Sequence, residues 1–151
     1  MRNVVQELID YAQEIKGYKA AYVNEAYDVS NIVLEKALTD NEILMLIYPL
    51  SGSQTVSKNV FGDITISTVL SFGRKSESES YSTIGENTKQ KWDNRIYELY
   101  NLGREFLEGF FGTCGIQYYE CTSVRWLQQI NKTSSNLDFA QIEITFTEWK
   151  Q

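Results

Sequence analysis

Histidine is absent from this sequence of 151 residues, and cysteine, proline and cationic side chains are scarce. Without histidine, Ser-His-Asp and Cys-His catalysis and nearly every common zinc site are excluded. Two cysteines, Cys114 and Cys121, do not make a disulfide framework, and we interpret both as reduced thiols. The single proline, Pro49, leaves no proline-rich linker that would separate two domains.

The sequence carries more acidic than basic side chains. Lys and Arg number 14 against 20 Asp and Glu, which gives a formal net charge of -6 and an isoelectric point near 4.7. A protein that binds the nucleic-acid backbone needs a cationic footprint, so this balance argues against a general nucleic-acid binder.

Long apolar runs are also missing. The most apolar stretch, residues 43–48, is far short of the ~20 residues of a membrane helix. The N-terminus is amphipathic and lacks the apolar core of a signal peptide. We therefore expect a protein that is made in the cytoplasm and does not enter a membrane.

Length and hydropathy pattern predict one α+β domain over residues 1–151. We expect an antiparallel sheet of about four strands, packed against one long helix, with a short N-terminal helix. The predicted elements are a helix over 2–16, strands over 43–50 and 61–73, a helix over 85–111 and a hairpin over 116–149.

The helices are predicted from apolar positions three and four residues apart. Leu8 and its neighbours form such a stripe, which Gly17 ends as a C-cap. In the second helix, Leu99, Gly103 and Phe106 share a face, and we expect its glycines to permit close packing rather than to bind phosphate.

The strands are predicted from apolar runs and from alternation. Residues 43–50 form a short apolar run that favours a strand buried on both faces, and residues 51–53 are expected to be a loop. Residues 61–73 alternate with a period of two. Residues 18–42 fit no clear pattern, and helix or irregular structure is weakly favoured there.

The sequence holds no catalytic, metal-ligand or cofactor motif, so we expect no enzyme activity, no metal and no cofactor. The notable feature is apolar and aromatic surface along strands. An open sheet must blunt its edges or use them to bind other chains. The candidate interface residues are Thr65, Ser67, Val69, Trp126 and Trp149.

The order of elements resembles the small neck proteins of tailed bacteriophages, the tail-terminator, tail-completion and head–tail connector group. The resemblance rests on a short helix, a strand ending in Tyr48-Pro49-Leu50-Ser51-Gly52, a long alternating strand from Asp63 to Phe72, a polar loop, a long helix and a closing hairpin. It is a likeness of layout that covers most of the chain except residues 18–42.

This resemblance implies a non-enzymatic virion protein, present in the host cytoplasm during assembly, that forms a ring, often a hexamer, at the head–tail junction. Its partners would be other copies of itself and head, neck or tail-tube proteins. Six copies at -6 each would carry -36 (6 × -6), so DNA would pass through without specific binding. The candidate lumen or partner loop holds Arg74, Lys75, Glu77 and Glu79.

Two other functions remain open at this stage. A small ligand-binding or enzymatic α+β domain would have an aromatic-lined pocket with convergent polar groups, such as Tyr118, Glu120 and Arg125. An adaptor or inhibitor that mimics nucleic acid through its acidic surface is the third alternative.

Overall fold

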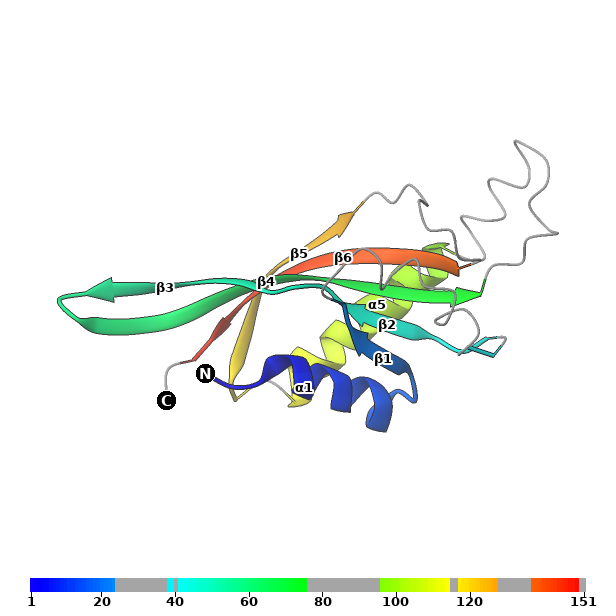
Figure 1. Cartoon of the computed structure of the whole chain (residues 1–151), viewed down its shortest axis with the longest axis horizontal. Coiled ribbons are helices and arrows are strands. Elements are labelled where there is room, and N and C mark those ends of the chain that lie inside the picture. The colour runs from blue at the N-terminus through cyan, green and yellow to red at the C-terminus, as the bar shows by residue number, and fades with distance from the viewer. Residues whose placement is uncertain (24–37, 40, 76–95, 115–116, 128–136, 150–151) are drawn as a thin grey trace.

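The chain forms a six-stranded mixed sheet with its helices against one face (Figure 1). This computed structural model describes residues 1–23, 38–39, 41–75, 96–114, 117–127 and 137–149. The elements in chain order are α1 Val4–Asp10, η1 Tyr11–Ile15, β1 Lys19–Tyr22, β2 Leu44–Ile47, β3 Ser51–Ser57, β4 Val60–Lys75, α5 Tyr97–Gly109, η4 Phe110–Cys114, β5 Tyr119–Leu127 and β6 Leu137–Glu148.

The strand order is β1-β2-β4-β6-β5, and β3 pairs with the first half of β4. The β1 strand runs parallel to β2, whereas every other pairing in the described sheet is antiparallel. The expected fold class, about four antiparallel strands against one long helix, is therefore wrong. Sheet dominates the described fold, and the helices are short.

The two unexpected strands lie where β propensity is low. β1 has the sequence Lys-Ala-Ala-Tyr, in the region expected to be helical or irregular. β3 starts at Ser51, where a loop was expected, and is rich in serine. Pairing with β2 and β4 holds these segments extended, because tertiary context outweighs a weak local preference.

The N-terminal helix begins at a side-chain cap and ends before the glycine that the sequence predicts. The Asn3 side chain caps it by accepting a hydrogen bond from the backbone N–H of Gln6, 3.2 Å away. After Ile15, Gly17 takes the left-handed conformation at φ 69°, and the Tyr18 N–H donates to the Ala12 carbonyl. This turn directs the chain into β1.

The main core lies between the helices and one face of the sheet. Its members include α1 and α5 side chains and the inward side chains of β4 and β6: Leu8, Leu99, Phe106, Phe72, Leu70, Ile142, Ile144 and Phe146. Gly103 brings α5 close to the sheet, since a Cβ there would lie 2.6 Å from Ile142 Cδ1 and 2.9 Å from Phe72 Cδ2. The predicted packing role of this glycine is confirmed.

A smaller core lies at the β2 end of the sheet and is centred on the opposite side chains of that strand. Leu44 and Leu46 pack there with Val23, Leu38 and Phe139. All four residues of β2 are buried, which confirms the prediction of a strand covered on both faces.

The second helix and the last hairpin differ in detail from expectation. The described part of the helix starts at Tyr97, and the predicted turns at 85–95 lie outside the described residues. In β5 the register shifts between Cys121 and Ser123. Because of this bulge, Tyr119 lies on the same sheet face as Trp126, and it is Tyr119 rather than Tyr118 that is buried.

Candidate assembly surfaces

The β3–β4 hairpin extends beyond the rest of the molecule as a two-stranded ribbon, defined here as residues 51–64 (Figure 1). β6 pairs with β4 only from Ile64 onward, so β3 is the one described partner of residues 60–63. Every residue of β3 is exposed. A two-stranded ribbon in water is marginally stable by itself, so residues 60–63 lack the support that the rest of β4 has from β6.

The ribbon is closed by a two-residue turn. Lys58 and Asn59 both have positive φ, 51° and 64°, and Ser57 pairs with Val60 across them. This is the geometry whose twist matches that of the flanking strands. The Gln54 side chain donates to the Gly62 carbonyl at 2.7 Å and holds the two strands in register.

The ribbon tip is apolar. Val56, Val60 and Phe61 are 53%, 60% and 55% exposed. Val56 pairs directly with Phe61, so these two side chains share one face of the ribbon, whereas the adjacent Val60 lies on the other. Both faces of the tip therefore carry apolar surface.

The predicted interface residues of β4 lie on the sheet face opposite α5. Val69 sits beside Glu143 of β6, and Thr65 sits beside Thr147. Ser67 and Thr145 share a hydrogen bond of 3.0 Å between their hydroxyl groups. These side chains are half-buried, so the face they form is polar and already linked across strands.

Arg74 and Lys75, expected at the start of the lumen or partner loop, belong to the strand β4. Arg74 is 8% exposed and its guanidinium pairs with Glu98 of α5 at 2.9 Å. Lys75 is half-buried at the end of the strand, opposite Leu137. The pairing with β6 continues two residues beyond the predicted end of the strand. Glu77 and Glu79 lie outside the described residues.

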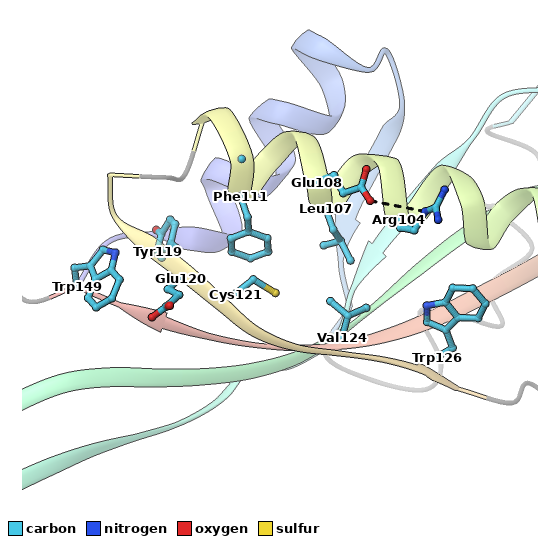
Figure 2. A pocket seen from close by; sticks show the side chains of 11 residues that line it. Arg104, Leu107, Glu108, Phe111, Tyr119, Glu120, Cys121, Val124, Trp126 and Trp149 are labelled. Atoms are coloured by element: carbon cyan, nitrogen blue, oxygen red, sulfur yellow. Dashed lines mark ion pairs between the residues drawn. The ribbon is translucent and has the colours of Figure 1, made fainter.

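A groove of about 650 Å³ lies between α5 and the edge strand β5 (Figure 2). We call it the α5–β5 groove. Leu107 and Phe111 border it on the helical side, and Cys121 and Val124 on the strand. Trp149 and Trp126 stand at its two ends, as Figure 2 shows.

The two tryptophans named from the sequence therefore line one surface. Trp126 is 50% exposed and stacks on Tyr100 of α5, whereas Trp149 is 40% exposed and follows the last strand. The backbone N–H of Trp149 donates to the Tyr118 carbonyl at 2.8 Å. Side-chain alternation alone does not predict Cys121 at this groove, because the bulge between Cys121 and Ser123 sets which β5 residues face α5.

Charge at the groove is mixed. Arg104 and Glu108 lie one helical turn apart on α5, with 3.9 Å between Arg104 Nε and Glu108 Oε1 (Figure 2). Glu120 is an exposed second acid on the strand side. Burial raises the pKa of the Cys121 thiol, so this thiol is protonated at neutral pH.

A polar cluster ties the N-terminus to the last hairpin. Arg2 pairs with Glu7 at 2.6 Å, and its guanidinium carbon lies 3.4 Å from the ring centre of Tyr118. The Tyr119 hydroxyl donates to Glu7, and the Arg2 backbone N–H donates to Glu148 at 2.7 Å. Burial and then the hydrogen bond to Glu7 raise the pKa of Tyr119 far above its usual range.

The three polar groups expected in an aromatic-lined pocket do not converge. Tyr118 lies against Arg2, and Arg125 pairs with Glu143 at 2.7 Å. Of the three, Glu120 alone lines the α5–β5 groove. The groove therefore has aromatic walls without the predicted polar set.

The ribbon was not predicted from the sequence. The available signal was the pair Lys58-Asn59 between Val56-Ser57 and Val60-Phe61, since asparagine tolerates the left-handed conformation that such turns need.

The described ranges offer neither a metal site nor a membrane-spanning helix. They contain no group of three or more Cys, Asp or Glu residues placed to hold a metal ion. The helices in the described part of the chain are also too short or too polar to span a membrane.

No protein-family model matches this sequence, and no curated protein matches it significantly.

Proposed function

We propose that this chain is a structural subunit of a phage or prophage head–tail junction, of the tail-terminator or tail-completion kind, that assembles into a ring around the DNA channel. The observation that carries the proposal is the ribbon of residues 51–64. Its apolar tip projects into solvent, and at its end β3 pairs with β4 alone. A subunit that is completed by its neighbours accounts for this arrangement.

Two further observations support an assembly role. The chain carries apolar surface at two separate places, the ribbon tip and the α5–β5 groove. A contact between two different patches on identical subunits closes into a ring when its rotation allows. The net charge of -6 per copy suits a channel that DNA must cross without binding.

The test is the state of assembly. Light scattering and negative-stain electron microscopy would be applied to the concentrated protein, both alone and co-expressed with the products of its flanking genes. We expect rings with a central hole in at least one preparation. A strict monomer in both preparations would overturn the proposal.

A matched pair of variants links assembly to the ribbon. Phe61→Ser removes apolar surface from the tip and should weaken assembly. Ile15→Ser removes a side chain that is 64% exposed on the N-terminal helix, and assembly should not change.

A ligand-binding domain is the second candidate function, favoured by the size of the α5–β5 groove. A volume of about 650 Å³ falls within the range of small-molecule sites, about 300–1,000 Å³. Its test is a screen of apolar and aromatic ligands by quenching of Trp126 and Trp149 fluorescence. Saturable quenching by a monomer would favour this function.

A further inference from the structure

We infer that the ribbon tip of one copy inserts into the α5–β5 groove of the next copy, head to tail. This inference rests on the proposed function, and it names the contact through which the ring closes. The occupant of the groove is thus a second copy of this chain.

The exposed apolar side chains are concentrated on the ribbon tip and the α5–β5 groove. In the described part of the chain, ten large apolar side chains are exposed. Three form the ribbon tip and three line the groove: Val56, Val60, Phe61, Val124, Trp126 and Trp149. More than half of the exposed apolar side chains therefore belong to two compact surfaces. Exposed patches of this kind mark sites of protein contact.

The shapes of the two surfaces are complementary. The ribbon projects past the body of the molecule, whereas the groove lies between α5 and β5 on the body itself (Figures 1 and 2). One surface protrudes and the other is hollow, so they suit each other better than either suits a second copy of itself. Such an unlike pair of surfaces makes a heterologous contact, which propagates from subunit to subunit.

The charges of the two surfaces are also complementary. Lys58, at the end of the ribbon, is the only cation in residues 51–64. The groove lining holds two acids, Glu108 and Glu120, against one base, Arg104. Because Arg104 lies beside Glu108, we assign Glu120 as the partner of Lys58 in the neighbouring copy.

Cross-linking tests the contact directly, because Cys121 already lines the groove. Cys114→Ser removes the other thiol, and Ser57→Cys places a new thiol at the ribbon tip. Oxidation forms a disulfide only when the two Cβ atoms lie about 3.5–4.5 Å apart. A short bis-maleimide is therefore used in a parallel reaction, because it joins thiols that are farther apart. The reaction is run at mildly alkaline pH, since the pKa of Cys121 is raised.

The inference predicts a ladder of covalent dimers, trimers and larger species on denaturing gels. Adding Cys121→Ser should abolish the ladder. The matched control, Gln13→Cys in place of Ser57→Cys, puts an exposed thiol on η1 and should give no ladder.

The cross-linking reaction is run on the preparation with the highest degree of assembly, and each other outcome then has a defined meaning. Rings without cross-links, or cross-linked dimers alone, would overturn the inference and leave the proposed function standing. Absence of any assembly would overturn both.

A charge exchange gives an independent readout. Lys58→Glu should weaken association roughly tenfold, as expected for loss of a close charge pair at an interface. Lys58→Glu combined with Glu120→Lys should restore it. If the double variant associates no better than Lys58→Glu alone, the assigned pairing is wrong.

Discussion

Trp126 of the edge strand lies flat on Tyr100 of α5, with ring centroids 5.3 Å apart and an angle of 14° between the planes. The Tyr100 hydroxyl also donates to the backbone carbonyl of Leu127, the next residue of β5. One tyrosine thus holds both the indole and the backbone of the strand. The outer indole surface stays half exposed, so the orientation of Trp126 is fixed from its inner side alone.

Trp149→Ala should reduce assembly more than it reduces the stability of the monomer. Trp149 is 40% exposed at one end of the α5–β5 groove, so its loss removes little from the core. Light scattering measures the effect on assembly, and urea denaturation measures the effect on the stability of the monomer. Equal losses in both would show that the side chain serves folding alone.

Phe106→Ala should lower the free energy of unfolding by about 3–5 kcal/mol, as is typical when a large aromatic leaves a core. Phe106 is fully buried and contacts the rings of Tyr11 and Phe72, with centroids 5.0 Å and 5.5 Å away. Chemical denaturation measures the change. Phe61→Ala is the matched control, because Phe61 is exposed at the ribbon tip and should cost the monomer much less. A loss below about 1 kcal/mol for Phe106→Ala would contradict this packing.

Gly103→Ala should destabilise the fold by about 1–3 kcal/mol, the usual cost of overpacking. The added Cβ would meet Ile142 at 2.6 Å and Phe72 at 2.9 Å, so α5 would have to move off the sheet. Gly112→Ala is the control, since no atom lies within 4 Å of a Cβ placed there. Thermal denaturation should separate the two variants, and equal melting temperatures would refute the close approach.

Stability should fall as the pH rises above about 10, and Tyr119 should contribute to that fall. Its pKa is raised in the folded state, chiefly by burial and then by its hydrogen bond to Glu7. Below the ordinary tyrosine pKa of 10.0 both states keep the proton. Above it, the unfolded chain releases the proton while the folded chain retains it, which favours unfolding.

Tyr119→Phe should make this alkaline loss of stability less steep. At neutral pH the same variant should cost about 1.5–3 kcal/mol, because a hydrogen bond to a charged carboxylate is lost. Urea denaturation of both proteins at a series of pH values gives the comparison. An unchanged slope above pH 10 would refute the role of Tyr119.

The elements predicted correctly from the sequence are those with a clear local pattern of apolar residues. Leu8 and Phe106 repeat at helical spacing, and residues 44–47 are a short apolar run, so these elements were identified. β1 and β3 were missed because they carry few β-branched or aromatic residues and are held by their neighbours.

The candidate surfaces were predicted less well. Trp126 and Trp149 were chosen because they lie near strand ends, and both line the groove. The ribbon depended on a turn defined by two backbone angles at Lys58 and Asn59, which alternation of side chains does not encode. Arg74 was assigned to a loop because it is charged, whereas Glu98 of α5 pairs with it within the fold.

The unbroken course of β4 has a mechanical consequence. This strand runs from Val60 at the free tip to Lys75 opposite Leu137 of β6, and Leu70 and Phe72 belong to the core that it shares with α5. The same strand therefore belongs both to the exposed ribbon and to the core beneath the helix. A force applied at the tip is transmitted along one backbone to the centre of the molecule.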